Sequence, residues 1–339
     1  MADKVRWGIV TAGMISHDFC NAFNSYKHKG DIVLAGIAAR DHKKAADFAK
    51  LHKIPKVFDT YEAMAKSSDI DVAYIGALNP DHYELSKLFL ENGKHVLCEK
   101  PLCMNYKQVK SLIDLSKKNR LFLMEAVWSR CSPAYKFLER EIRLGKIGEV
   151  KYVEASFGIP VAPVGKLRKR AIGGSALMDF GLYTLQFAQF IFQDEPKKVS
   201  VVGELDIDGK DVVETVVLDY EGGRRAVLNI HANVKLWNKA VVIGTEGRAL
   251  LEDPFHFPTE MTVNEEKSKF PLHESNVPYN FGNSAGLVYE ILEVSKCLTN
   301  RLIESSRMDH RESLILAKIE DNIRQQLGVH FDVDNKEYP

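Results

Sequence analysis

The sequence predicts an α/β protein with two structural units, each built on its own sheet. The first observation behind this prediction is length: 339 residues exceed what a single hydrophobic core usually serves. The second is a change of strand pattern near residue 127, from short unbroken apolar runs to longer alternating ones. Unbroken runs are typical of parallel sheets that are covered on both faces, and alternation is typical of antiparallel sheets. We therefore expect units at residues 1–126 and 127–339.

Strand and helix patterns alternate along the first unit. Its apolar runs predict strands at residues 5–10, 32–38, 57–58, 72–76, 95–98 and 121–124. Polar helical stretches lie between them, for example at residues 80–92 and 105–119. Repeated βα units with right-handed crossovers give a doubly wound parallel sheet. Such sheets bind ligands at the carboxyl ends of their strands, so functional residues are expected in the loops that follow the strands.

Longer, alternating segments make up the second unit. They predict strands at residues 149–157, 198–205, 211–220, 224–232, 240–244 and 249–252, with turns such as Glu221-Gly222-Gly223 between them. Helices are expected at residues 133–144, 175–192, 285–300 and 310–327. Alternation indicates an open, mostly antiparallel sheet with one face packed on helices.

Composition and charge exclude several classes of protein. The 46 basic and 46 acidic residues balance, which argues against a nucleic-acid partner. No apolar run reaches the length of a membrane span, so no membrane association is expected. Residues 1–4 lead into a strand pattern without the apolar region of a secretion signal. The five cysteines lack metal-ligand spacing, so we expect reduced thiols, no metal site and a cytoplasmic location.

The loop after the first strand carries a partial dinucleotide fingerprint. It reads Thr11-Ala12-Gly13-Met14-Ile15-Ser16, and of the three usual glycines only Gly13 remains. Gly13 holds the middle position, which lets the backbone approach a pyrophosphate. A glycine in a βα turn is common, so this match is weak alone, but the repeated βα units strengthen it. We expect residues 11–15 to bind a nicotinamide dinucleotide.

Basic residues follow the second strand. An acid at that place would bind the ribose 2′-hydroxyl of NAD, whereas this chain has Arg40 at the turn, with Lys43 and Lys44 next. Cations suit the 2′-phosphate of NADP. The alternative is that these are solvated charges at the start of a helix. Because Arg40 lies at the turn itself, NADP is the expected cofactor.

The triplet Glu99-Lys100-Pro101 follows the fifth strand. A lysine at the carboxyl end of a parallel strand points into the crevice where these sheets bind ligands. The proline fixes the backbone directly after it. Glu99 and Lys100 are therefore expected beside the cofactor.

Asp179 and Tyr183 lie four residues apart in the predicted helix 175–192, so they share one helix face. A tyrosine packed in the core would explain that spacing equally well. However, a phenol with a pKa of about 10 becomes a useful acid or base when an ammonium stabilises its phenolate. We expect Tyr183 to exchange the alcohol proton during hydride transfer and Lys100 to lower its pKa. Asp179 would position substrate hydroxyls or Lys100.

Further candidates lie at other strand ends. Asn79 and His82 are expected near the cofactor, although they would also suit the start of a helix. Trp128 and Arg130 follow the sixth strand and are expected to line a substrate pocket, or else to form a structural hinge. Phe157 ends the first strand of the second unit and is expected to face the same cleft.

Taken together, these motifs resemble the glucose–fructose oxidoreductase/inositol dehydrogenase/MocA (Gfo/Idh/MocA) family. The resemblance rests on Thr11-Ala12-Gly13, Glu99-Lys100-Pro101 and Asp179-x-Gly181-x-Tyr183, and it covers nearly the whole chain. Members have an N-terminal Rossmann domain and a C-terminal domain on an open, mostly antiparallel sheet. Their usual motif ends in histidine, where this chain has Tyr183. In this tyrosine the chain resembles one branch of the family, the dimeric dihydrodiol dehydrogenases, which are also called D-xylose 1-dehydrogenases (NADP).

The resemblance implies an enzyme that oxidises trans-dihydrodiols of aromatic rings to catechols and D-xylose to its lactone, with NADP as cofactor. It implies Tyr183 as the acid/base, Lys100 as its helper and Arg40 at the 2′-phosphate. It also implies a homodimer that pairs through the open sheet face, with residues 228–234 as a contributor. The alternatives are another sugar or polyol as substrate, or an NADP-binding regulator without turnover.

Overall fold

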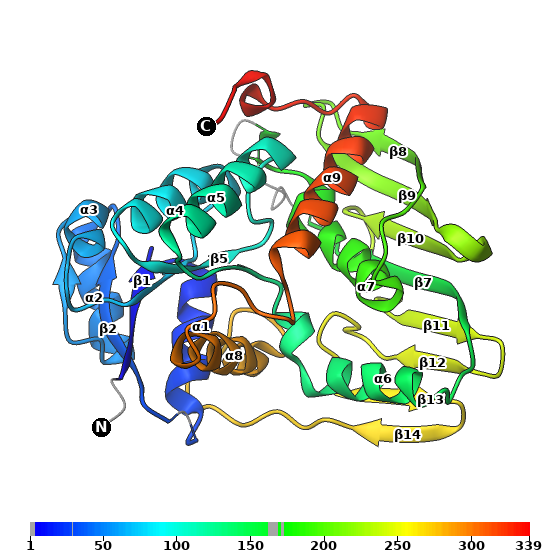
Figure 1. The fold of residues 1–339 in the computed structure, drawn as a ribbon, viewed down its shortest axis with the longest axis horizontal. Helices are drawn as coiled ribbons and strands as arrows, with labels where there is room; N and C mark the ends of the chain where they lie inside the picture. Colours follow the sequence, from blue (N-terminus) through cyan, green and yellow to red (C-terminus); the bar gives the residue numbers. More distant parts are fainter. Residues whose placement is uncertain (1–3, 29, 162–168, 171–172) are drawn as a thin grey trace.

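A computed structural model describes residues 4–28, 30–161, 169–170 and 173–339. Within these residues the predicted fold class is confirmed: a six-stranded parallel sheet is followed by an eight-stranded, mostly antiparallel sheet. Figure 1 shows the two sheets side by side, with helices between them. Because segments from late in the chain pack against the first sheet, the boundary at residue 126 remains a prediction.

The first sheet has the strand order β3-β2-β1-β4-β5-β6, and all of its pairs are parallel. Its strands are β1 (Val5–Val10), β2 (Ile32–Ala38), β3 (Val57–Phe58), β4 (Val72–Ile75), β5 (His95–Glu99) and β6 (Leu123–Ala126). Side chains of β4 and β5 are buried almost completely, which is why their sequences do not alternate. The order reverses between β1 and β4, and that reversal opens a crevice at their carboxyl ends.

Helices cover both faces of this sheet. They are α1 (Met14–Ser25), α2 (His42–His52), α3 (Tyr61–Ala65), α4 (His82–Glu91) and α5 (Tyr106–Asn119). Three begin at capping side chains that accept a backbone N–H: Asp41 for α2, Thr60 for α3 and Asn105 for α5. These caps fix where each helix starts and so where the preceding loop ends.

The second sheet has the strand order β14-β13-β12-β11-β7-β10-β9-β8. Only β7 and β10 pair in parallel; the other described pairs are antiparallel. The strands are β7 (Val150–Gly158), β8 (Lys198–Leu205), β9 (Asp211–Asp219), β10 (Arg225–His231), β11 (Ala240–Gly244), β12 (Arg248–Leu251), β13 (Glu260–Val263) and β14 (Glu266–Lys269).

Strands β13 and β14 were not expected from the sequence. The β14 segment reads Glu-Lys-Ser-Lys and carries no apolar alternation. Its pairing is supported instead by ion pairs of Lys267 and Lys269 with Glu260 on β13, at 2.6 and 3.4 Å. Cross-strand charge pairs of this kind leave no hydrophobic signal in the sequence.

One face of the second sheet is covered by helices and the other is open. Helices α6 (Pro133–Arg143), α7 (Leu182–Phe192) and α9 (His310–Leu327) lie on the covered face, and α8 (Val288–Thr299) lies beside α1 (Figure 1). A π-helical turn, Leu177–Gly181, precedes α7. On the other face, alternate side chains of β9 and β10 are only half-buried, as expected for an open sheet face.

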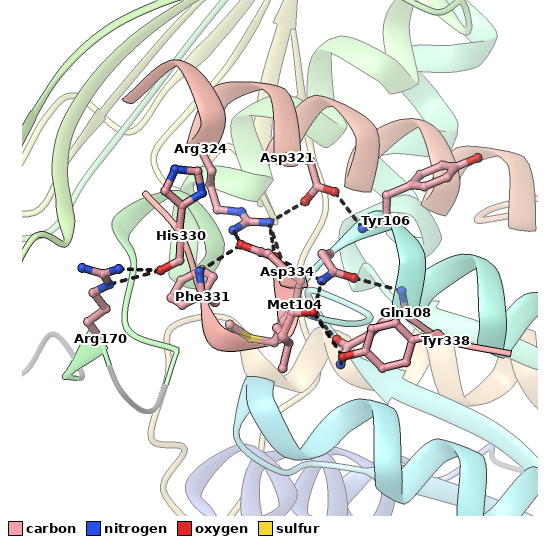
Figure 2. Close-up of polar contacts among 12 residues, drawn as sticks. Met104, Tyr106, Gln108, Arg170, Asp321, Arg324, His330, Phe331, Asp334 and Tyr338 are labelled. Atoms are coloured by element: carbon pink, nitrogen blue, oxygen red, sulfur yellow. Dashed lines mark hydrogen bonds and ion pairs between the residues drawn. The ribbon is translucent and has the colours of Figure 1, made fainter. Parts of the chain in front are cut away.

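The last residues of the chain return to the first unit. Arg324 on α9 is buried and pairs with Asp334 at 2.8 Å and with Asp321 at 2.6 Å. Asp334 in turn accepts a hydrogen bond from Asn105, which caps α5, and Asp321 accepts one from the backbone of Tyr106 (Figure 2). We call residues 328–339 the C-terminal strap.

Two findings concern the expectations about membrane spans and cysteines. None of the described helices is both long and apolar enough to cross a membrane. All five cysteines are buried free thiols.

Candidate active site

A cavity of about 1600 Å³ lies between the two units, at the carboxyl ends of β1, β4 and β5. The loop at residues 11–15 lines one end, together with Ala39, Arg40, Asp41 and Lys44. Side chains of both units line the other. They include most of the predicted site residues, namely Asn79, Glu99, Lys100, Trp128, Phe157, Asp179 and Tyr183. The structure therefore brings together motifs that are up to 172 residues apart in the chain, from Thr11 to Tyr183.

Helix α1 begins at this cavity without a side-chain cap. Its N-cap residue is Gly13, which has no side chain that could accept a hydrogen bond from the first turn. Uncapped N–H groups and the positive end of the helix dipole form a site for an anion such as a pyrophosphate. The position suits the dinucleotide expected from the fingerprint.

Thr11 explains why glycine is usual at the first position of the fingerprint. Its φ is +82°, in the left-handed region that disfavours side chains. The Thr11 hydroxyl donates to the Gly76 carbonyl at 2.6 Å and lies 3.3 Å from the Ser16 hydroxyl. These contacts offset the strain and hold the loop against the end of β4.

Arg40 is exposed at the cavity rim, directly after β2. The neighbouring Asp41 carboxylate is engaged as the cap of α2, since its Oδ1 accepts the Lys44 backbone N–H at 3.0 Å. Arg40 and Lys44 both line the cavity, and Tyr61 lies beside them. The arrangement leaves two cations at the place where an adenosine ribose is expected.

Lys100 lies at the other end of the cavity, after β5. Its Nζ donates to the Asp179 carbonyl at 2.5 Å and lies 5.0 Å from the centre of the Tyr183 ring. Glu99 also lines the cavity, and its carboxylate accepts a hydrogen bond from the Tyr74 hydroxyl at 2.7 Å. The Asp179 carboxylate accepts one from Asn79 at 3.4 Å. Lysine, aspartate and tyrosine therefore meet as the spacing predicts.

Tyr183 is buried, and its hydroxyl accepts a hydrogen bond from Trp128 Nε1 at 2.8 Å. Burial and the nearby Glu99 carboxyl raise the pKa of Tyr183 well above 10. The sequence led us to expect that Lys100 lowers the pKa of Tyr183, and the direction is the opposite. The reason is that the Lys100 ammonium binds the Asp179 carbonyl and faces the Tyr183 ring, not its hydroxyl. At neutral pH the group is therefore a phenol, which is ready to donate a proton.

Aromatic rings form a wall beside Tyr183. We call Trp128, Phe157 and His256 the aromatic wall; all three line the cavity. The rings of Phe157 and His256 stack at 4.8 Å, and His256 lies 4.7 Å from Tyr183. Burial and the Lys100 ammonium lower the pKa of His256 to about 3, so its imidazole is neutral.

Sequence reasoning missed His256 and several other lining residues. They lie in irregular segments of the second unit, where neither spacing nor periodicity marks a site: Ile159, Asn238, His256, Phe281 and Asn283. The one available signal was an aromatic run after β12, Phe255-His256-Phe257, and aromatic residues are also common in cores.

Two predicted residues lie outside the described lining of the cavity. His82 is fully buried, with its ring nitrogens 2.8 and 3.2 Å from the carbonyl oxygens of Pro101 and Ala77. Arg130 is buried and donates to Gln186 and Glu312. These positions favour the structural alternatives stated for both residues: His82 joins two loops through the Pro101 and Ala77 carbonyls, and Arg130 joins the chain to α7 and α9.

Family models match most of the chain. The Gfo/Idh/MocA oxidoreductase family, with its NAD-binding Rossmann fold, matches residues 5–127, and the C-terminal domain of the same family matches residues 135–250. The chain belongs to the Gfo/Idh/MocA oxidoreductase family. The predicted resemblance is thereby confirmed.

Relatives within the Gfo/Idh/MocA family match over their full length. The trans-1,2-dihydrobenzene-1,2-diol dehydrogenase of Xenopus tropicalis is 40% identical, over 96% of this chain and 99% of its own. Those of Danio rerio and Homo sapiens are 39% and 38% identical, over 98% of this chain and 99% of their own. These relatives show that the chain is a dehydrogenase, which sets aside the regulator without turnover.

Solved Gfo/Idh/MocA-like structures show the same fold. A levoglucosan dehydrogenase in complex with NADH and levoglucosan has a TM-score of 0.84 and 18% identity, over 96% of this chain and 97% of its own. A 3-ketoreductase from Actinomadura kijaniata in complex with NADP has a TM-score of 0.78 and 23% identity, over 95% and 98%. The first of these complexes holds NADH and the second NADP, so the fold accommodates either.

Proposed function

We propose that this dehydrogenase uses NADP to oxidise trans-dihydrodiols of aromatic rings to catechols and D-xylose to its lactone. The observation that carries the proposal is a buried tyrosine, Tyr183, under a lysine and beside an aromatic wall. The full-length relatives named as dihydrodiol dehydrogenases support this substrate class.

The cavity fits a dinucleotide cofactor along its length. The uncapped start of α1 suits the pyrophosphate, and the carboxyl ends of β4 and β5 suit the nicotinamide end. Arg40 and Lys44 would hold the 2′-phosphate of NADP. The engagement of Asp41 in a helix cap supports NADP over NAD, because the nearest acid is already partnered. When bound, the nicotinamide supplies the acceptor for the hydride.

The residues around Tyr183 provide the proton chemistry. In oxidation, the Tyr183 phenolate takes the hydroxyl proton of the substrate while the carbon that bears this hydroxyl loses its hydride. In the reverse direction the phenol returns the proton to the carbonyl oxygen. Trp128 donates to the Tyr183 oxygen and so stabilises the phenolate. Lys100, fixed by the Asp179 carbonyl, supplies a positive charge beside the ring, and Asp179 and Asn79 offer polar contacts to further hydroxyls.

The aromatic wall gives the substrate end a flat, apolar side. Such a surface suits the face of a dihydrodiol ring or the C–H face of a sugar. It also excludes water from the reacting carbon. The aromatic wall and the polar residues that line the same cavity therefore suit a substrate that has one hydroxylated edge.

We propose that two copies pair through the open face of the second sheet. Residues 228–234 comprise the end of β10 and the three residues that follow it; β10 is an internal strand of the sheet, where Asn229 and Thr215 are hydrogen-bonded at 2.9 Å. This proposal rests on the resemblance to the dimeric branch. We also propose that the protein is cytoplasmic.

Replacing the proposed acid/base tests the reaction. In Tyr183→Phe we expect kcat for D-xylose and for trans-1,2-dihydrobenzene-1,2-diol to fall by about 10²–10⁴-fold, because the proton loses its acceptor. NADPH formation measures turnover, and quenching of protein fluorescence by NADPH measures cofactor binding. Tyr152→Phe, on the second sheet away from the cavity, is the control. Full turnover in Tyr183→Phe would refute this mechanism.

Replacing the rim cation tests the cofactor. In Arg40→Ala we expect KM for NADP to rise about 10-fold or more while KM for NAD stays within about twofold, because only NADP carries the 2′-phosphate. Steady-state kinetics with each cofactor measures both. Arg120→Ala, at the far end of α5, is a matched control. An unchanged KM for NADP would leave Arg40 without the proposed role.

A further inference from the structure

His256 has a feature that distinguishes it from the other rings of the aromatic wall. Its Nδ1 is enclosed by protein and has no hydrogen-bond partner among the described residues. The ring itself lines the cavity. Nε2 is therefore the nitrogen that a bound molecule can reach.

The protonation of His256 follows from its surroundings. Burial, together with the Lys100 ammonium, keeps the ring neutral throughout the physiological range. A neutral imidazole carries a single N–H. We assign it to Nε2, because a buried N–H without an acceptor is costlier than a buried lone pair. His256 consequently presents one hydrogen-bond donor to the cavity, and it cannot serve as a proton carrier at neutral pH.

The other polar group of the wall is already engaged. Trp128 gives its only N–H to the Tyr183 hydroxyl, and Phe157 has none. The rings of His256 and Tyr183 lie 4.7 Å apart at an interplanar angle of 32°. Two polar edges at this spacing can serve two neighbouring oxygens of one substrate.

We propose that His256 determines specificity for vicinal diols. Tyr183 handles the hydroxyl that is oxidised, and Nε2–H of His256 donates to the hydroxyl on the neighbouring carbon. This inference rests on the proposed function and deepens it: the preferred substrates carry two adjacent hydroxyls. Phe157 supports His256 by stacking on it at 4.8 Å, which fixes the direction of the ring.

A cycle of substrates and variants tests the inference. The substrates are D-xylose and 2-deoxy-D-xylose, which lacks the hydroxyl next to the reacting carbon. In the wild type we expect kcat/KM to favour D-xylose by about 10-fold or more, as for one lost hydrogen bond to a buried group. In His256→Phe, which keeps the stacking ring and removes the donor, this preference should disappear. His28→Phe, at an exposed site, should retain it.

Amide variants provide the rescue. A glutamine amide reaches about as far as Nε2, whereas an asparagine amide reaches only as far as Nδ1. His256→Gln should therefore restore part of the preference and His256→Asn should not. Because the imidazole is neutral, the wild-type preference should stay constant between about pH 6 and pH 9.

The outcomes separate this inference from the proposed function. A wild type that oxidises neither D-xylose nor the dihydrodiol would refute the proposed function, and the inference with it. A wild type that turns over D-xylose while His256→Phe keeps the full preference would refute the inference alone. If His256→Phe does not fold, as judged by NADPH binding and circular dichroism, equal preferences in His256→Gln and His256→Asn would refute it instead.

Discussion

Tyr183 works in an environment that opposes its own ionisation. It is buried beside Glu99, and both influences favour the neutral phenol. The Trp128 N–H and the Lys100 charge act in the other direction. An exposed phenol next to a cation would ionise more easily than Tyr183 does. The Tyr183 phenol is therefore ready to donate its proton in the reduction, whereas the phenolate that the oxidation needs becomes more abundant only as pH rises.

The pH dependence of turnover follows from this balance. Oxidation needs the phenolate, so its kcat/KM should rise by about tenfold per pH unit between about pH 6 and pH 9. Reduction needs the phenol, which is fully present over that range, so its kcat/KM should be flat. Initial rates in both directions measure the two profiles. Tyr183→Phe should lose the slope of the oxidation profile, and a flat wild-type oxidation profile would contradict this account.

The sequence revealed the site residues that are positioned by regular structure. Gly13 and Lys100 follow strands, and Asp179 and Tyr183 share a helix face, so position along an element predicted their meeting. His256 and Phe281 lie in irregular segments, where direction depends on tertiary packing. For His82 and Arg130 the sequence left two alternatives open, because position at a strand end does not say whether a side chain turns toward the cavity or the core.

At the scale of elements, one acidic side chain joins helix α1 to the segment around Phe281 that lines the cavity. Asp18 on α1 is fully buried, and its carboxylate accepts the backbone N–H groups of Asn280 and Phe281 at 2.8 and 2.9 Å. It also accepts the Asn280 side-chain amide at 2.9 Å. Phe281 lines the cavity. Helix α1 therefore follows the loop at residues 11–13 directly and, through Asp18, also contacts the segment that lines the cavity at Phe281.

Removing this charge should loosen the rim. In Asp18→Asn we expect KM for substrate to rise more than kcat falls, because one acceptor oxygen at the rim is replaced by an NH2 group that cannot accept a backbone N–H, while Tyr183 is untouched. The free energy of unfolding should fall by about 1–3 kcal/mol. Steady-state kinetics and urea unfolding measure the two effects. Asp47→Asn, exposed on α2, is the control, and an unchanged KM would show that the rim is held by other contacts.

Most elements could be predicted from the sequence, because apolar periodicity separates buried parallel strands from alternating antiparallel ones. The helix predicted at residues 175–192 is present, but its first turn is π-helical around Asp179. Periodicity cannot show a single wider turn, which often marks a functional site. The strand order of the second sheet, with β7 and β10 parallel at its centre, is likewise set by packing of distant segments.

At the scale of the whole molecule, the C-terminal strap connects the last residues to the first unit. Its Asp334 accepts hydrogen bonds from Asn105 and from Arg324, and Figure 2 shows the contact with Arg324. Burial opposes ionisation of Asp334, but the hydrogen bonds from Arg324 and from the Phe331 backbone lower its pKa overall. Its contribution to stability is therefore present above the unfolded pKa of about 4 and lost as pH falls through the folded value.

Cutting the strap's central contact should destabilise the protein. In Asp334→Ala the free energy of unfolding should fall by about 1–3 kcal/mol near pH 7, because buried Arg324 loses a partner, and by less near pH 3. Urea unfolding at both pH values measures this. Glu337→Ala, which removes the exposed pair with Lys107, should cost less than about 1 kcal/mol. Equal losses of unfolding free energy in Asp334→Ala and Glu337→Ala would contradict the prediction that the buried contact of Asp334 contributes more than the exposed one of Glu337.

Contacts from late segments of the chain, the strap among them, also bear on how the protein is made. The cap of α5, the surface of β6 and the side of α1 all receive contacts from residues beyond 270, which are synthesised after the first sheet. A nascent chain that has completed its first six strands still lacks these partners. We expect the dinucleotide-binding half to remain loose during synthesis and to become able to hold its cofactor only after these later segments have been made. Completion of the cavity therefore depends on residues far downstream of the first sheet.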